Sequence, residues 1–156
     1  MNYLAVVGIT NNIKILDRRG NVKKELPVEG ARVVQSLEWD MDSDTISLAL
    51  KDSNVVLLWP VFTKSEFSEI VVGEGEQVTF QRWSNTHPVL AIGTKKGGLV
   101  FFNKRTKKKN PTVFKHSKQV YDGDWNADGN LSRFIRSDTL SHRRKGQIHH
   151  HIGSYL

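Results

Sequence analysis

Three tryptophans recur along the chain at a nearly constant interval, and each closes a short run of strand-forming residues. The runs are Val33 to Trp39, Val78 to Trp83 and Val120 to Trp125, so the tryptophans stand 44 and then 42 residues apart. A polar turn follows each tryptophan. A repeat of this length is one supersecondary unit that buries its apolar surface only by stacking on its neighbours.

Each unit continues with further strand-like segments separated by tight turns. Residues 46–50 and 55–59 follow the first tryptophan, residues 89–93 and 99–103 follow the second, and the opening residues 4–17 repeat this second half. Short strands with turn signals every eight to twelve residues are typical of four-stranded propeller blades. The sequence therefore predicts an all-β fold, an incomplete β-propeller of about three blades in an open arc. The alternative is an antiparallel sandwich, which requires three matched units by coincidence.

The repeat also predicts which side chains are buried. Small residues in the second strands are expected where neighbouring blades pack closely near the axis. The side chains expected to be largely buried are Trp39, Trp83, Ala49, Ala91, Leu48, Leu90, Leu57 and Phe101.

The repeat divides the chain into a propeller part and a tail. Residues 1–131 are predicted to form the propeller, as units 1–30, 31–75, 76–116 and the start of a fourth, 117–131. Aligning Leu131 with Leu90 places Arg133 in a buried second strand, and burying an unpaired charge is costly. Residues 132–156 carry five Lys and Arg against one Asp, with four of the six His. We therefore expect a basic tail, disordered or out of register, that does not continue the fourth blade.

Several residues resemble the WD-repeat family, in which a Gly-His pair opens a unit and Trp-Asp closes its third strand. Leu58-Trp59 and Ile15-Leu16-Asp17 end third strands, and Lys115-His116 lies about nine residues before Trp125. The resemblance implies a WD40-type propeller and a His116 that anchors an inter-blade loop. The structural repeat positions it implies are Trp39, Asp52, Trp59, Trp83, His116 and Trp125.

The amino-acid sequence of residues 2–20 and 90–127 is similar to that of the intraflagellar transport protein 144 family, and the similarity covers roughly residues 2–131. It implies a noncatalytic interaction scaffold of the retrograde intraflagellar transport complex A. The partners would be protein subunits of that complex, and the location would be the cilium, the ciliary base and the cytoplasm. The expected role is in cilium assembly and ciliary protein transport.

One basic run supports an alternative function. Dense Lys and Arg side chains bind phosphate groups on nucleic acid or on membranes. No aromatic residue is interleaved with them, so stacking on bases is not predicted. The alternative is a basic adaptor that binds nucleic acid or an anionic membrane through this loop and the tail, and a solvated loop is the simpler interpretation. The residues for this contact are Lys104, Arg105, Lys107, Lys108 and Lys109.

The remaining motifs predict no catalysis, no cofactor and no metal site. The chain has no cysteine, which excludes disulfides and thiolate chemistry. Asp40-x-Asp42-x-Asp44 begins like a calcium loop, but Thr45 and Lys51 replace the required Gly and Glu, so we expect a solvated turn. No nucleophile and base are suitably spaced. The longest apolar stretches are far short of the roughly 20 residues that a membrane-spanning helix needs.

An open arc also leaves strand edges without partners. Such edges are templates for association with other chains. We therefore expect the isolated chain to be marginally stable and to self-associate.

Overall fold

The computed structural model describes residues 3–28, 33–111, 119–129 and 131–136, and within these ranges the chain forms strands and turns but no helix. The strands make four antiparallel sheets. The first contains β1 (Leu4–Val7), β2 (Asn12–Leu16) and β3 (Val22–Pro27); the second contains β4 (Val34–Trp39), β5 (Thr45–Leu50), β6 (Val55–Pro60) and β7 (Ser68–Val71). The third contains β8 (Val78–Trp83), β9 (Val89–Thr94), β10 (Leu99–Asn103) and β11 (Lys108–Lys109); the fourth contains β12 (Val120–Trp125) and β13 (Leu131–Arg136).

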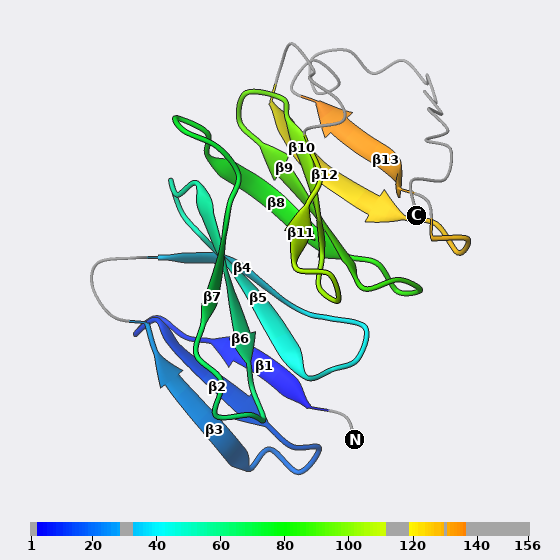
Figure 1. Cartoon of the computed structure of the whole chain (residues 1–156). Coiled ribbons are helices and arrows are strands. Elements are labelled where there is room, and N and C mark those ends of the chain that lie inside the picture. The colour runs from blue at the N-terminus through cyan, green and yellow to red at the C-terminus, as the bar shows by residue number, and fades with distance from the viewer. Residues whose placement is uncertain (1–2, 29–32, 112–118, 130, 137–156) are drawn as a thin grey trace, which may run out of the picture.

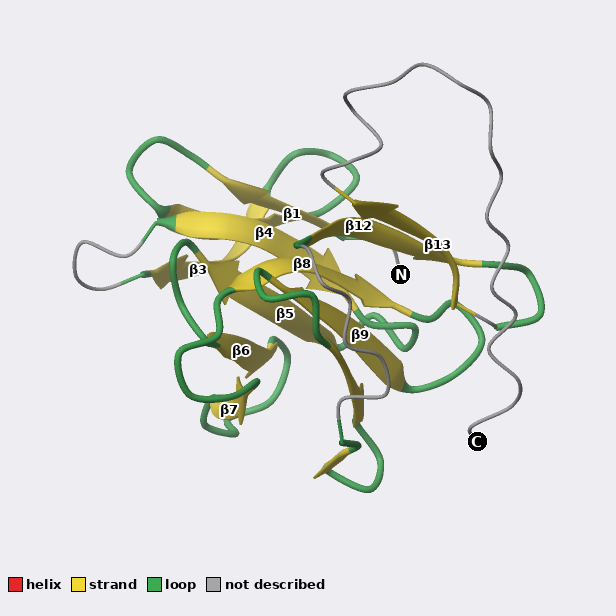
Figure 2. Ribbon diagram, turned by 90° about the horizontal axis from the view of Figure 1, so that it is seen from above, coloured by secondary structure: helices red, strands yellow, loops and turns green. Residues whose placement is uncertain are grey.

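The sheets succeed one another across the molecule in chain order, from β1–β3 at one end to β12–β13 at the other (Figure 1). Within each sheet the strands also follow chain order. The first strands of three successive sheets are neighbours, since β4 lies against β8 and β8 against β12 (Figure 2). This is the expected architecture, an incomplete propeller whose sheets are blades and whose arc is open.

The second sheet is buried on both faces, and its alternating residues contribute to two different cores. All six residues of β5 are buried. Ile46, Leu48 and Trp59 pack with Ile13 and Ile15 of the first sheet. Since full burial of one Leu or Ile contributes about 1.5–3 kcal/mol, this cluster holds the first sheet onto the second.

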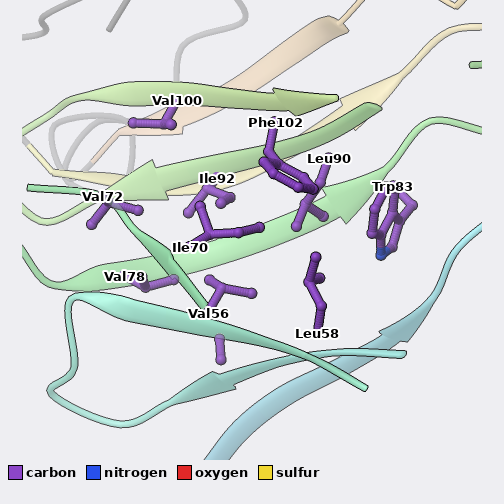
Figure 3. Close-up of a cluster of buried hydrophobic side chains, with 11 residues drawn as sticks. Val56, Leu58, Ile70, Val72, Val78, Trp83, Leu90, Ile92, Val100 and Phe102 are labelled. Atoms are coloured by element: carbon purple, nitrogen blue, oxygen red, sulfur yellow. The ribbon is translucent and has the colours of Figure 1, made fainter. Parts of the chain in front are cut away.

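The opposite face of the second sheet forms the core that joins it to the third sheet. Val56 and Leu58 of β6 pack in one cluster with Leu90, Ile92 and Phe102 of the third sheet (Figure 3). Because neighbouring residues of a strand point to opposite faces, one apolar strand supplies both junctions. The nearly continuous apolar runs in the second strands follow from this double burial.

A smaller core joins the third sheet to the fourth. It contains Phe80, Leu99 and Val120, with Phe101 partly buried against it. A Cβ added at Gly93 would lie 2.0 Å from the Phe80 ring. The small residue in this second strand therefore makes room for a phenylalanine of its own sheet, whereas crowding between neighbouring blades was the expected cause.

Most of the expected core positions are buried. Leu48, Ala49, Trp83, Leu90 and Ala91 have between 0% and 4% of their surface exposed. Trp39, Leu57 and Phe101 are only half-buried, so the expectation was too strong for them. Trp39 and Leu57 pack at the rim of the first junction and Phe101 at the rim of the last.

The fourth sheet continues past residue 131, where the tail was predicted to begin. β13 continues to Arg136 and pairs with β12, with Arg133 opposite Asp124 and Phe134 opposite Gly123. The prediction assumed that a following blade covers this strand and would bury the arginine. In the described part of the chain the β12–β13 sheet is the last, and backbone pairing is open to any residue other than proline. The rest of the predicted tail, residues 137–156, lies outside the described residues.

No helix long and apolar enough to cross a membrane occurs in the described ranges.

Candidate functional site: blade junctions and the axial groove

The repeat tryptophans form hydrogen bonds that link successive blades. The Trp83 indole Nε1–H donates to Ser47 Oγ of the second sheet at 2.9 Å. The Trp125 Nε1–H donates to the Arg82 carbonyl of the third sheet at 3.0 Å. The corresponding Nε1 of Trp39 is buried and has no hydrogen-bond partner among the described residues. Trp83 and Trp125 therefore bond to the preceding blade, whereas Trp39 only packs against the apolar cluster of the first junction.

The other repeat positions are distributed between the core and the loops. Trp59 lies in the core of the first junction, where it stacks on Phe67 with ring centroids 6.3 Å apart. Asp52 is exposed in the β5–β6 turn, with a positive φ of 56°. His116 lies outside the described residues, so its expected anchoring of an inter-blade loop stays a prediction.

Two lysines of the basic run have partners in the second blade, which neither the solvated-loop interpretation nor the anion-binding alternative included. The Lys104 Nζ is ion-paired with Asp40 and Asp44 of the second sheet, the latter at 2.6 Å, and lies 3.7 Å from Asp42. The Lys109 Nζ donates to the Val71 carbonyl at 2.6 Å.

These two lysines link the third sheet to the second. Arg105, Lys107 and Lys108 are exposed. The run is therefore divided: Lys104 is half-buried in the blade junction, Lys109 bonds to the second sheet from an exposed position, and the middle residues are exposed.

The acidic turn is exposed at Asp42 and Asp44, as expected of a solvated turn, but Asp40 at its start is buried. Only 1% of the Asp40 side chain is exposed, and its Oδ1 accepts hydrogen bonds from the amides of Asp44 and Thr45, both at 3.1 Å. The ammonium group of Lys104 occupies the centre of the three aspartates. The three aspartates, whose spacing resembles the start of a calcium loop, therefore lie around the ammonium group of Lys104.

The charges of this cluster shift one another's ionisation. Burial raises the pKa of Asp44, but hydrogen bonds from Lys104 and Thr45 outweigh it and hold the pKa below its usual value. Burial lowers the pKa of Lys104, but its hydrogen bonds to Asp40 and Asp44 outweigh that effect and raise it. Both directions favour the charged pair, so the junction is ionic at neutral pH.

A shallow groove of about 330 Å³ lies where the first strands β4, β8 and β12 begin. Its lining combines amide, hydroxyl and phenol groups with a few charged residues at the rim. The lining residues are Val33, Gln35, Lys51, Asp52, Gln77, Val78, Thr79, Lys95, Gln119 and Tyr121. We call it the axial groove, because it runs across the first strands of three successive blades.

Gln35, Thr79 and Tyr121 hold equivalent places in this groove, each four residues before a repeat tryptophan. The Gln35 side-chain amide donates to the Thr79 carbonyl at 2.8 Å, and the Thr79 hydroxyl donates to the Val120 carbonyl. Each of these two side chains therefore bonds to the first strand of the next blade. Tyr121 is 44% exposed. Sequence reasoning missed these residues, although counting back from each tryptophan would have found them.

Charged side chains follow the groove residues farther along the same first strands, β4, β8 and β12. The Arg82 guanidinium lies 2.8 Å from Glu38 and 3.7 Å from Asp122. The other Glu38 oxygen accepts from the Trp83 amide at 3.0 Å. Burial of Glu38 raises its pKa, against the effect of these partners. The arrangement joins three blades through ion pairs and hydrogen bonds.

Metal binding has no support within the described ranges, where no group of three or more His, Cys, Asp or Glu is placed to hold an ion. The polar groups of the blade junctions and of the axial groove are suited to binding another molecule. The axial groove presents amide and hydroxyl groups suited to a peptide backbone, and the junctions hold its three walls in place.

The comparisons with known proteins agree with the repeat. The family described as WDR19 first beta-propeller matches residues 1–145, which extends past the boundary predicted at residue 131. A chain in the crystal structure of the mitotic checkpoint complex has a TM-score of 0.68 at 22% identity, covering 84% of this chain and 40% of that one. This second likeness concerns the fold alone.

Relatives of known name are similar over most of the chain. WD repeat-containing protein 19 of Homo sapiens is 36% identical and that of Mus musculus 35% identical, each over 131 residues, or 84% of this chain and 10% of the relative. WD repeat-containing protein dyf-2 of Caenorhabditis elegans is 27% identical over 119 residues, or 75% of this chain and 8% of the relative. The chain thus spans about a tenth of the length of these relatives. It belongs to the WDR19 first beta-propeller family.

Proposed function

We propose that this chain is a noncatalytic protein-interaction scaffold of the retrograde intraflagellar transport complex A, acting in cilium assembly and ciliary protein transport. The observation that carries the proposal is the family match over residues 1–145. Its location would be the cilium, the ciliary base and the cytoplasm, and its partners would be protein subunits of that complex.

The axial groove is the surface we assign to a protein partner. Tyr121 offers an exposed aromatic ring, and tyrosine is enriched at binding hot spots. Gln77 and Gln119 line the groove beside it and provide side-chain amides for the backbone of a partner. The side-chain Oε1 of Gln77 already accepts from the Lys95 ammonium at 2.9 Å, which fixes the orientation of this amide.

Co-purification from ciliated cells tests the proposal. The tagged chain should recover subunits of the retrograde complex, and Tyr121→Ala should reduce that recovery several-fold. Val71→Ala is the matched control, because Val71 is equally exposed at 46% but lies on β7, away from the groove. Recovery no greater than that of an unrelated propeller would refute the function, whereas equal recovery by both variants would refute only the assignment to the groove.

Self-association is also part of the proposal. β1 pairs only with β2 in the described sheet, and Leu4 and Val22 of that sheet are 58% and 50% exposed. Unpaired edges and exposed apolar side chains favour association between copies. Light scattering coupled to size exclusion should detect oligomers, and a monodisperse monomer with a cooperative, high-temperature melt would contradict this.

A further inference from the structure

Two lysines hold equivalent places in the lining of the axial groove. Lys51 directly follows β5, and Lys95 directly follows β9. The Lys51 amide donates to the Val33 carbonyl at 2.8 Å. The Lys95 amide donates in the same way to the Gln77 carbonyl at 2.9 Å. The repeat therefore places a lysine at the same position of the groove in two successive blades.

The charges of these two lysines are not neutralised within the described ranges. Both side chains are exposed, and neither belongs to any ion pair between described residues. The Lys95 ammonium uses one donor on Gln77 Oε1, and an ammonium group has further donors. The Lys51 ammonium bonds to no described residue. Both groups are therefore available to a ligand.

The neutral side chains of the groove divide into bonded and available groups. Gln35 and Thr79 bond to the first strand of the next blade. Gln119 and Tyr121 form no hydrogen bond with a described residue. Tyr121 lies on β12, the first strand beside β8 (Figure 2). Three successive blades therefore each contribute a group that can donate to a ligand.

Asp52 limits the charge of the site. It is the one carboxylate among the described residues of the lining, and it directly follows Lys51. Two lysines against one aspartate leave the lining with a net positive charge. A densely charged phosphate polymer or membrane would be repelled by Asp52, whereas single carboxylates can pair with the lysines alone. A volume of about 330 Å³ holds a short extended segment and not a folded domain.

We propose that the axial groove binds an extended segment of a partner protein through acidic side chains, Glu or Asp, that pair with Lys51 and Lys95. Tyr121 packs on the segment, and the Gln119 amide bonds to its backbone. The inference rests on the proposed function, which assigns this groove to a protein partner, and it names the chemistry of that partner.

The lysines serve selection more than affinity. Ion pairs between exposed groups contribute little to binding energy. Charge complementarity instead speeds association and rejects partners of the wrong charge. The contact with the exposed Tyr121 ring supplies the larger share of the affinity.

A support-bound library of random short peptides is the probe, and the full chain is the labelled protein. The peptides that it retains should be enriched in Glu and Asp relative to the library. The double variant Lys51→Gln, Lys95→Gln should lose this enrichment and bind the retained peptides roughly fivefold more weakly. Lys96→Gln is the matched control, because Lys96 is exposed beside Lys95 but does not line the groove. No acidic enrichment, or an equal loss with Lys96→Gln, would overturn the proposal.

A second variant predicts a gain of affinity, which damage to the fold would not produce. Asp52→Asn removes the carboxylate that repels the ligand, so the retained peptides should bind roughly twofold more tightly. The backbone of Asp52 has a positive φ of 56°, a conformation that Asn adopts as readily as Asp. Unchanged or weaker binding by this variant would contradict the proposed electrostatic selection.

Recovery of complex subunits from ciliated cells separates this inference from the proposed function. Acidic enrichment that depends on the lysines, together with no recovered subunit, would refute the proposed function and support the acidic site. Recovery that Tyr121→Ala lowers and the lysine double variant leaves unchanged would refute the acidic site alone. An oligothymidylate that binds as tightly as the acidic peptides, and through the same lysines, would also overturn the inference, because the ligand would then be a nucleic acid.

Discussion

The junction between the first and second sheets and the junction between the second and third differ at one equivalent residue. The Val61 amide donates to the Asp44 carbonyl, and the Lys104 amide donates to the Pro88 carbonyl, both at 2.9 Å. The two residues therefore follow the third strands of their blades in the same backbone geometry. Val61 is fully buried in an apolar cluster, whereas the Lys104 ammonium is paired with buried Asp40.

Aromatic rings pack together at the first junction, whereas carboxylates pair with a lysine at the second. Phe62 lies 4.8 Å from Tyr3 and 6.3 Å from Trp39, measured between ring centroids. Lys104 instead lies 2.6 Å from Asp44 and 3.7 Å from Asp42, in addition to its pair with Asp40. The repeat thus fixes the backbone of a blade junction, while the residues after the third strand determine whether it is apolar or ionic. The following predictions test this difference, in order of decreasing effect.

Val61→Lys should have the largest effect, because it gives the first junction the side chain of the second without its carboxylates. An uncompensated buried charge destabilises by about 3–5 kcal/mol. Urea denaturation measures the loss. Val61→Ala is the control, with an expected loss of about 1–2 kcal/mol from the removed methyl groups. A smaller loss for Val61→Lys than for Val61→Ala would show that this position accepts an ionic junction.

Asp40→Ala should be next, with a loss of about 3 kcal/mol, because two backbone donors lose their acceptor and the Lys104 ammonium loses its buried partner and keeps only the exposed Asp44 and Asp42. Asp42→Ala is the matched control in the same turn. Its carboxylate is 45% exposed and 3.7 Å from Lys104, so its removal should change the stability by about 0.5 kcal/mol or less. Equal losses for both variants, by urea denaturation, would contradict a special role for the buried aspartate.

Acid should weaken the second junction more than the first. The pKa of Asp44 is lowered in the folded chain, so its contribution to stability is present above the unfolded value near 3.8 and is lost as the pH falls through the folded value. Lys104→Met removes the partner that lowers this pKa, and its stability should fall less steeply between pH 5 and 2.

The measurement is the urea midpoint at each pH. Because Asp44 is half exposed, solvent screens the pair, and this effect is smaller than the first two. Val61→Ala serves as the control and should keep the acid dependence of the unmodified chain. Parallel curves for Lys104→Met and the unmodified chain would contradict the prediction.

Lys14→Ala should have the smallest effect. Lys14 and Glu25 form an ion pair of 3.4 Å on the first sheet, and both side chains are more than 40% exposed. Exposed pairs contribute about 0.2–1 kcal/mol. A loss above about 2 kcal/mol in urea would mean that exposed pairs matter as much as the buried one.

The repeat predicted the strands closely because it rests on local patterns. The run expected from Val78 to Trp83 is β8 and the run from Val120 to Trp125 is β12, while the run from Val33 begins one residue later in β4. Alternation and turn residues act within a few positions of the chain, so they are visible in a single sequence. The same patterns gave an incomplete propeller as the fold.

The junction chemistry was not visible, because it joins residues far apart in sequence. Lys104 reaches aspartates some 60 positions earlier, so both segments were interpreted separately, one as a basic loop and one as a solvated turn. Gly93 was likewise attributed to crowding near the axis, when the ring of Phe80 fills its space. Predicting these contacts requires superposing one blade on the next before assigning any charged residue to a partner.

A double-mutant cycle between Asp40 and Lys104 tests the central claim most directly, namely that this pair joins the second and third sheets. The variants are Asp40→Ala, Lys104→Met and both together, with free energies of unfolding from urea denaturation. The predicted interaction energy is about 2 kcal/mol, in the range measured for residues in contact. The same cycle with Asp42 in place of Asp40 should give about 0.5 kcal/mol or less. An Asp40–Lys104 value as small as that of the Asp42 cycle would contradict the account.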